Sequence, residues 1–310
     1  QKYFPDLLRI LEEETGIQSG LIEKDYWIMQ VLNGLKKQHF DFELKGGTSL
    51  SKGYMIIDRF SEDIDIHIKP PVEMYVEEDP LKTKRRSSLS RRNFYDWLAA
   101  SIKIDGIASV ERDYAFDDKD YYRSGGIRLY YKSQASSVNG IKEGILLEAG
   151  FDTVTPNIGI NISSWAYDKA KLNSAVDIVD NRAINIACYH PGYTFVEKLQ
   201  TIAAKFRQEQ NKGEVRPNLL RQYYDVYCLL SNKMVQEFIG TPGYKIHKER
   251  RFSKTDLDIP IALNEAFLLN TPGLRAKYRK RYEETPALYY NGQPDFDELL
   301  DRLKGYIDRL

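Results

Sequence analysis

The strongest constraint in this sequence is a short stretch in which acidic and apolar side chains alternate strictly, Asp63-Ile64-Asp65-Ile66-His67-Ile68. Successive side chains of a β-strand point to opposite faces, so the isoleucines predict one buried face and the two aspartates share the other. Two carboxylates held that close repel each other, and both stay ionised only beside positive charge. A divalent cation supplies such charge, and an oxygen-only ligand set favours Mg²⁺ or Mn²⁺ over zinc.

A glycine pair precedes this strand in the sequence. Gly46 and Gly47 follow a predicted strand at 42–45, and a short helix is expected over 48–55. Glycine lets backbone N–H groups approach phosphate oxygens, and Thr48 and Ser49 add hydroxyl donors at a helix start. A phosphate cradle followed at short range by a metal-binding aspartate pair is the arrangement that phosphoryl or nucleotidyl transfer requires.

The remaining pattern predicts an α+β fold with two domains, residues 1–190 and 191–310. The first 40 residues are expected to be largely helical, with Ser19 as the cap of a helix that runs to Leu35. Strands are expected between about 107 and 163, most clearly at 127–131 and 144–148. The other expected elements are a long loop over 70–92, a helix over 94–104, and two helices over 195–210 and 219–232.

Composition excludes several classes of protein. The chain has 310 residues, of which 42% are hydrophobic, and 45 basic residues balance 45 acidic ones. It has no apolar run long enough for a membrane span and no apolar signal sequence at its start, and two cysteines cannot build a disulfide framework, so a cytoplasmic protein is expected. Nucleic acid would have to bind at local basic patches. Two clusters qualify: Lys82, Lys84, Arg85, Arg86, Arg91 and Arg92, and Arg275, Lys277, Arg279, Lys280 and Arg281.

Five blocks of sequence carry a family resemblance: Ile22–Trp27, Lys45–Lys52, Arg59–Asp65, Phe195–Leu199 and Arg221–Tyr227. With these blocks the chain resembles the AbiEii/AbiGii-type nucleotidyltransferase toxins, within the DNA polymerase β-like nucleotidyltransferase superfamily. The resemblance covers roughly residues 20–230, and residues 235–310 contribute nothing to it. It implies a mixed sheet with flanking helices, followed by a helical domain.

The resemblance also implies an activity and its partners. A toxin of this kind would transfer NMP from an NTP to an RNA acceptor, plausibly a tRNA 3′ end, release pyrophosphate, and be encoded with an antitoxin protein. Its implied catalytic and metal residues are Asp63, Asp65, Lys198 and Asp225. Its implied nucleotide-binding residues are Gly46, Gly47, Thr48, Ser49, Lys52 and Lys24. The superfamily usually adds a third carboxylate; Glu148 fits its strand face, and Asp152 is the rival.

Alternatives remain open at this stage. Glu23, Lys24 and Asp25 fit the exposed side of an amphipathic helix, and Asp225 lies four residues after Arg221, as in an intrahelical ion pair. Without the resemblance, solvated charge is the usual explanation of Lys198 and of both basic clusters. The acceptor is alternatively a protein hydroxyl or a small molecule, and a non-catalytic binding module is the third reading. Ser61, two residues before Asp63, is a possible regulatory phosphosite.

Overall fold

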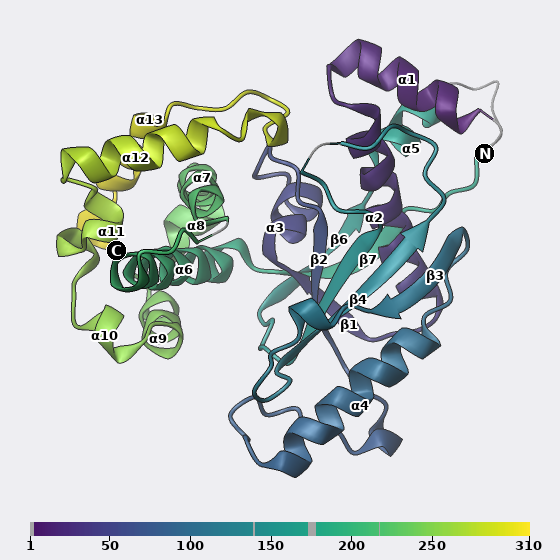
Figure 1. Cartoon of the computed structure of the whole chain (residues 1–310), viewed down its shortest axis with the longest axis horizontal. Helices are drawn as coiled ribbons and strands as arrows, with labels where there is room; N and C mark the ends of the chain where they lie inside the picture. Colours follow the sequence, from purple (N-terminus) through teal and green to yellow (C-terminus); the bar gives the residue numbers. More distant parts are fainter. Residues whose placement is uncertain (1–2, 139, 173–177, 217) are drawn as a thin grey trace. The chain divides into compact units, whose positions relative to one another are not determined.

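The computed structural model describes residues 3–138, 140–172, 178–216 and 218–310. The chain divides into two compact units (Figure 1). The first unit contains Gln1–Tyr54 and Phe60–Tyr189, and the second contains Met55–Arg59 and His190–Leu310. The short segment 55–59 therefore packs with residues far from it in sequence, which the sequence pattern did not indicate.

The first unit is built on one mixed seven-stranded sheet with the strand order β3-β4-β5-β2-β1-β7-β6. The central strand β2 is antiparallel to β1 and parallel to β5, and β1 is parallel to β7. The strands are β1 Phe42–Lys45, β2 Asp63–Ile68, β3 Ile107–Arg112, β4 Ser124–Tyr131, β5 Ile145–Gly150, β6 Asn157–Ile162 and β7 Ala183–Tyr189. The predicted α+β class is confirmed.

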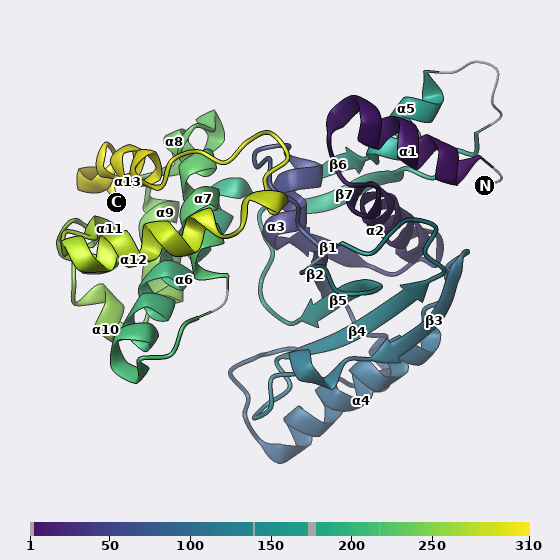
Figure 2. The same cartoon turned by 45° about the horizontal axis from the view of Figure 1, so that its top comes forward.

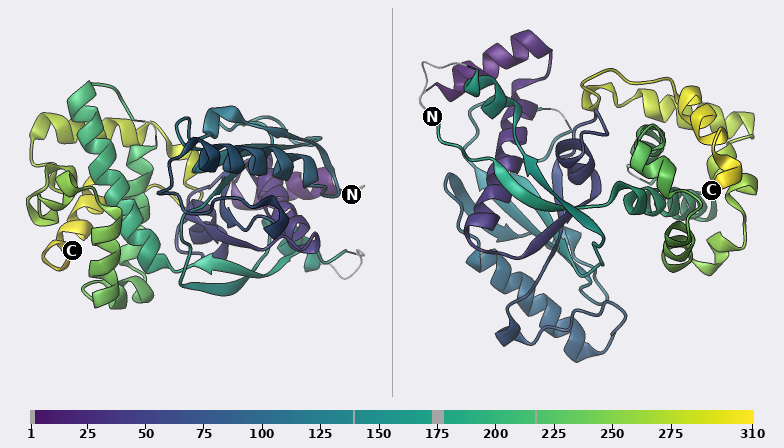
Figure 3. Two further views of the ribbon diagram at one scale, coloured as in Figure 1. Left: turned by 90° about the horizontal axis from the view of Figure 1, so that it is seen from below. Right: turned by 180° about the vertical axis from the view of Figure 1, so that it is seen from behind.

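Helices cover the apolar face of this sheet (Figures 1 and 3). The unit's helices are α1 Phe4–Thr15, α2 Ser19–Lys37, α3 Gly46–Thr48, α4 Arg85–Ser101 and α5 Trp165–Lys171. Ile64, Ile66 and Ile68 of β2 are buried in one core with side chains of α2 and α4, as the alternation predicted. Asp63, Asp65 and His67 consequently lie on the other face, which makes that face polar at the centre of the sheet.

Two predictions about local structure were wrong, and one strand was missed. The stretch 70–92 is not one loop, because α4 begins at Arg85 and lies beside β3 and β4 (Figure 2). No proline or glycine occurs between Leu81 and Ser101, so nothing in the sequence stops the helix there. Strand β7 was not predicted, because its buried and exposed positions do not alternate regularly. Gln18, and not Ser19, occupies the cap position of α2.

The buried side chain of Arg91 stabilises the polar N-terminal part of α4. This side chain is fully buried, and its guanidinium donates hydrogen bonds to four backbone carbonyls. The acceptors are the carbonyls of Glu77, Asp79, Lys82 and Tyr121. The planar guanidinium with five donors suits this task, and it fixes the segment 77–82 to α4.

The second unit is helical, with α6 at its centre (Figure 3). Its helices are α6 Pro191–Lys212, α7 Leu219–Leu230, α8 Lys233–Phe238, α9 Pro242–Arg251, α10 Lys254–Leu257, α11 Glu265–Leu268, α12 Pro272–Glu283 and α13 Phe296–Lys304. The two helices predicted here, 195–210 and 219–232, correspond to α6 and α7. Within the described ranges, no helix has the length and apolar character to cross a membrane.

Candidate active site

The first unit brings three of the predicted acidic residues to one place on the polar face of the sheet. The strand register pairs Lys45 of β1 with Asp65 of β2, and Asp65 with Glu148 of β5. Asp63 lies two residues before Asp65, on the same face of β2. The register therefore places Glu148 directly opposite Asp65.

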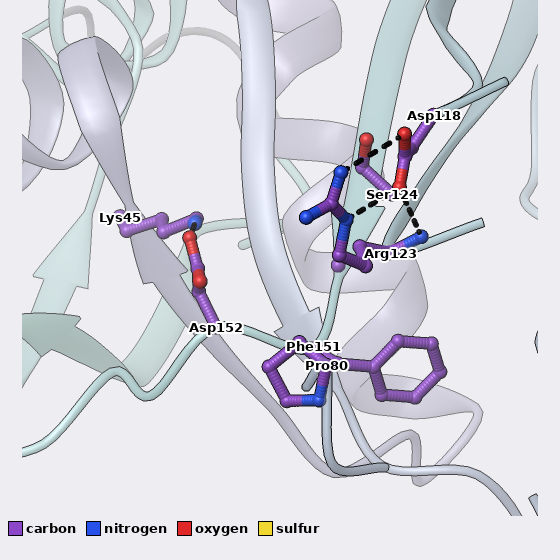
Figure 4. Close-up of a pocket in the computed structure, with 8 residues that line it drawn as sticks. Lys45, Pro80, Asp118, Arg123, Ser124, Phe151 and Asp152 are labelled. Atoms are coloured by element: carbon purple, nitrogen blue, oxygen red, sulfur yellow. Dashed lines mark hydrogen bonds and ion pairs between the residues drawn. The ribbon is translucent and has the colours of Figure 1, made fainter. Parts of the chain in front are cut away.

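The rival carboxylate, Asp152, lies beyond the end of β5 and forms an ion pair with Lys45, with 3.1 Å between Oδ2 and Nζ (Figure 4). Strand pairing distinguishes the two acids in a way that their sequence positions could not. His67 also lies on the polar face, where its Nδ1 is 2.9 Å from Oε2 of Glu43.

The carboxyl groups strongly perturb one another. Burial, together with repulsion from Glu62 and Asp65, raises the pKa of Asp63 to about 6. Burial also raises the pKa of Glu148, with further contributions from the charges of Asp65 and Asp63 and from a hydrogen bond with Asp65. A group of buried carboxyl groups that raise one another's pKa is a place where a cation would relieve the repulsion.

The donor chemistry of this cluster fits a divalent cation. All three side chains offer only oxygen, the ligand type that Mg²⁺ and Mn²⁺ prefer. In this structure, no three His, Cys, Asp or Glu side chains of the described ranges are grouped as a metal site. The case for a cation thus comes from the oxygen donors, their shared strand face and their mutual pKa shifts.

Gly46 is required by the position of Asp65. A Cβ atom at residue 46 would lie 2.0 Å from Oδ2 of Asp65, closer than any side-chain atom can approach. The backbone φ of Gly46 is also +71°, which other residues rarely adopt. The predicted glycine loop therefore contacts the predicted aspartate directly, because only a residue without a side chain leaves room for the carboxylate.

The hydroxyl groups after the glycine pair are buried inside the protein. Thr48 and Ser49 are both fully buried. The Thr48 hydroxyl donates a hydrogen bond to the backbone carbonyl of Asp63, which ties the start of β2 to α3. Ser49 begins a π-helical turn, Ser49–Gly53, and its buried hydroxyl oxygen has no hydrogen-bond partner among the described residues. In this conformation the backbone around Gly46, and not these hydroxyls, is the part of the loop available to a phosphate.

Three consecutive charged residues of α2 are buried, so the prediction of an exposed helix face at Glu23, Lys24 and Asp25 was wrong. The Glu23 carboxylate accepts hydrogen bonds from the loop after β4, at 2.6 Å from the Ser133 hydroxyl and at 2.9 and 3.1 Å from the backbone N–H groups of Gln134 and Ala135. A buried charge persists only when it is paired or hydrogen-bonded, and here each one binds a different segment.

The two lysines predicted to bind nucleotide both have acidic partners in the first unit. The Lys24 amine lies 2.5 Å from the carbonyl oxygen of Lys142 and 3.5 Å from Oε2 of Glu62. The Lys52 amine lies 2.7 Å from Oδ1 of Asp25. Burial lowers the pKa of Lys24, although Glu62 and Asp63 oppose that effect. Direct contact of either amine with a nucleotide would require it to leave these partners.

The second unit contains the other two predicted residues, Lys198 and Asp225, in a buried ion-pair cluster. Asp225 is completely buried, and Arg59 binds its two oxygens through Nε and Nη2 at 2.6 and 2.7 Å. The Lys198 amine is 2.9 Å from Oδ2 of Asp225. Burial alone would raise the pKa of Asp225, but Arg59 and Lys198 outweigh it and hold the pKa below its usual range. These are long-range pairs, unlike the intrahelical pair with Arg221 considered from the sequence.

Comparison with known proteins identifies the family. The sequence model described as the nucleotidyl transferase AbiEii toxin of type IV toxin–antitoxin systems matches residues 30–302. The chain belongs to the AbiEii family. It is therefore a nucleotidyltransferase, and membership implies an NTP substrate and an antitoxin partner.

Among solved structures, the AbiEii-family chain is similar to an antigenic nucleotidyltransferase-like protein from Paracoccidioides brasiliensis. The identity is 12% and the TM-score 0.35, over 75% of this chain and 95% of that one. The comparison with curated proteins found no match.

Arg59, which belongs to the buried ion-pair cluster of the second unit, was missed when site residues were selected from the sequence. Arg59 begins the block that carries the family resemblance, but nothing in its neighbourhood indicated a partner 166 residues away. It is 5% exposed, and its buried charge is matched by Asp225. The available signal was its place at the start of the Arg59–Asp65 block.

We predict that Gly46→Ala reduces nucleotidyl transfer by about 100-fold or more, because the new methyl group displaces the Asp65 carboxylate. The matched control is Gly16→Ala. Gly16 has φ +72° and nothing within 4 Å of a built Cβ, so it tests backbone strain alone. Gly16→Ala should lose about 1–2 kcal/mol of stability in thermal unfolding, and Gly46→Ala should lose at least that much because the clash adds to the strain. Equal activity of the two variants would contradict the proposed contact.

We predict that substitution of Asp225 mainly lowers stability and that substitution of Lys198 mainly lowers activity. Asp225→Asn leaves the Arg59 charge buried without its partner and should cost about 3–5 kcal/mol in chemical denaturation. That contribution is complete above the ordinary aspartate pKa of 3.8 and is lost as the pH falls through the depressed folded value.

Lys198→Met keeps the Arg59–Asp225 pair. It should therefore change stability by only about 1 kcal/mol and reduce nucleotidyl transfer by about 100-fold or more if Lys198 binds phosphate. A stable and fully active Lys198→Met enzyme would remove that lysine from the catalytic set.

Proposed function

We propose that this AbiEii-family enzyme transfers a nucleoside monophosphate from an NTP to the hydroxyl of an RNA, most plausibly at a tRNA 3′ end. The observation that carries the proposal is the convergence of Asp63, Asp65 and Glu148 on one sheet face, with Gly46 packed against Asp65. Extending that RNA end would block aminoacylation and arrest growth, which agrees with a family of toxins.

The carboxylates would hold Mg²⁺ or Mn²⁺, and the bound cations would supply positive charge to the acidic cluster and the triphosphate. This chain's own residues position the substrates. The backbone at Gly46 and Gly47 would bind phosphate oxygens, and the carboxylates would hold the cations that attract the triphosphate. Lys198 would stabilise negative charge on phosphate.

The reaction forms one bond and breaks one. The hydroxyl oxygen of the acceptor attacks the α-phosphorus in line, and an O–P bond forms. The bond between the α-phosphorus and the oxygen that bridges to the β-phosphate breaks, and pyrophosphate leaves with that electron pair. The hydroxyl proton is released to water, so atoms and charge balance without an oxidant or reductant.

A second candidate keeps the reaction and changes the acceptor to a protein hydroxyl or a small molecule. The two candidates differ in their need for positive surface. An RNA acceptor carries one charge per nucleotide and is held mainly through its phosphates, whereas a hydroxyl on a protein or a small molecule is not.

One experiment tests the proposal. The protein is incubated with total cellular RNA, Mg²⁺ or Mn²⁺ and each α-³²P-labelled NTP, beside an Asp63→Asn/Asp65→Asn control. Label in a tRNA-sized band that is absent from the control establishes the reaction and names the nucleotide. Label on protein supports the second candidate. A folded protein that labels neither class, with metal present, contradicts the proposal.

The same assay decides the third carboxylate. Glu148→Gln should lower kcat by about 100- to 1,000-fold, because Glu148 lies opposite Asp65 in the register. Asp152→Asn is the matched control; it removes the partner of Lys45 and should change kcat by less than about 10-fold. The reverse order of effects would assign the role to Asp152.

Ser61 is proposed as a regulatory phosphosite. It is half-buried and two residues before Asp63, so a phosphate there would add negative charge beside the acidic cluster and compete with the nucleotide. We predict that Ser61→Asp lowers transfer by about 10-fold or more, because it adds a negative charge near Asp63. A phosphate carries more charge and should lower transfer further. Ser61→Ala should stay near wild type in the same labelling assay. Unchanged transfer by Ser61→Asp would exclude electrostatic control at this position.

A further inference from the structure

The two basic clusters of the sequence differ in how many of their side chains form ion pairs or hydrogen bonds within the protein. In the second unit, Arg275 and Arg279 both pair with Asp297, and Arg281 pairs with Glu209. In the first unit, Arg91 is buried among backbone carbonyls and Arg92 pairs with Asp96. Lys277 and Lys280 remain in the second unit, and four exposed cations remain in one short segment of the first unit, Lys82, Lys84, Arg85 and Arg86, here called the basic segment. Among the described residues, their side chains form no ion pair or hydrogen bond.

The backbone at the start of the basic segment is fixed by hydrogen bonds from the buried Arg91 side chain. Arg91 binds the carbonyl of Lys82 and the two carbonyls of Glu77 and Asp79 that precede it. Two acidic side chains of that loop accept local backbone hydrogen bonds, Glu77 from the N–H of Asp79 and Asp79 from the N–H of Leu81, and Glu78 is exposed. The protein carries no net charge, so a fixed group of four unpaired cations is a distinct feature of its surface.

A pocket adjoins this segment in the same unit. Its volume is about 320 Å³, and Pro80, just before the basic segment, forms part of its wall (Figure 4). Lys45, Ser124 and Gly150 line it as well. Gly150 follows Glu148 by two residues on β5, so it lies on the same face of the sheet as the acidic cluster. The pocket is thus lined both by a residue that precedes the basic segment and by the sheet face that carries Glu148, and its size suits about one nucleotide.

The pocket offers donors and acceptors in pairs. Lys45 lies beside Asp152, and Arg123 lies beside Asp118, with 2.6 Å between Nε and Oδ2 (Figure 4). The Arg123 side chain is 48% exposed, so its guanidinium can bind a phosphate without unfolding anything. A nucleotide presents both phosphate oxygens for the cations and base N–H groups for the carboxylates, which matches this mixed lining.

We propose that the basic segment binds the phosphates of a single-stranded RNA end and that the pocket holds its terminal nucleotide, so that the 3′ hydroxyl reaches the Glu148 side of the acidic cluster. This inference rests on the proposed function and adds the path of the acceptor. It assigns Lys82, Lys84, Arg85 and Arg86 to strand binding, and Arg123 and Lys45 to the terminal nucleotide.

The test compares two quadruple charge reversals. Lys82→Glu/Lys84→Glu/Arg85→Glu/Arg86→Glu changes the basic segment. The control Lys36→Glu/Lys37→Glu/Lys212→Glu/Lys254→Glu makes the same change of charge at exposed lysines outside both basic clusters. Thermal unfolding verifies that both variants fold. The readouts are binding of a short fluorescein-labelled single-stranded RNA, label transfer to bulk tRNA, and titration with a non-hydrolysable NTP analogue.

Loss of four phosphate contacts should flatten the dependence of log K on log salt by about 3 and weaken RNA binding by about 10-fold or more. The KM for tRNA should rise with little change in kcat, and NTP affinity should match wild type. The control should bind RNA as wild type does or lose only a small, general part of its affinity. Equal loss in both variants would overturn the proposal, because it would show general charge and not a site.

A second variant tests the pocket without altering charge. Ser124→Phe fills the space next to Gly150 and should lower kcat/KM for tRNA by about 10-fold or more, while RNA binding through the basic segment and NTP affinity persist. Wild-type kcat/KM in this variant would exclude the pocket as the acceptor site. If wild-type enzyme labels no RNA at all, the proposed function fails, whereas the binding comparison still decides whether the basic segment binds RNA.

Discussion

The rest of this structure depends on how one strand, β2, divides its side chains between two faces. The isoleucines of β2 are buried beneath α2 and α4, so the strand cannot slip by one residue without exposing all of them. The same register fixes Asp63 and Asp65 on the opposite face, with Lys45 and Glu148 as the strand partners of Asp65. Hydrophobic burial on one face thus holds mutually repelling carboxylates together on the other.

Helix α2 supports this arrangement from the core. It has thirteen buried residues, including three consecutive charged ones, which no solvent-facing amphipathic helix would contain. Glu23 holds the loop after β4, Lys24 holds the backbone next to β5, and Asp25 binds Lys52 after the glycine loop and accepts the backbone N–H of Trp165. These buried charges connect the segments that surround the acidic cluster, so they fix the geometry of that cluster without entering it.

The second unit relies on a comparable interaction. Asp225 is buried and is neutralised by Arg59 and Lys198, and the lowered pKa of Asp225 shows that these two cations more than offset the cost of burial. Arg59 comes from the short segment 55–59, which separates from its sequence neighbours to join the helical unit. An arginine that binds a buried carboxylate with two hydrogen bonds fixes both position and orientation of that segment.

The sequence alone determined the alternating strand, the glycine loop before it and the helices α2, α6 and α7, because burial periods and glycine geometry are local properties. Two-residue spacing was enough to place Asp63 and Asp65 on one face. The sequence could not determine partners: whether Glu148 or Asp152 lies opposite Asp65, that Arg59 binds Asp225, or which of six neighbouring cations is buried. Charged side chains carry no periodic signal for burial, and long-range pairing depends on strand register and on the packing of segments distant in sequence. Only the tertiary structure therefore decided that Glu23, Lys24, Asp25 and Arg91 are interior residues and that Lys82, Lys84, Arg85 and Arg86 face solvent.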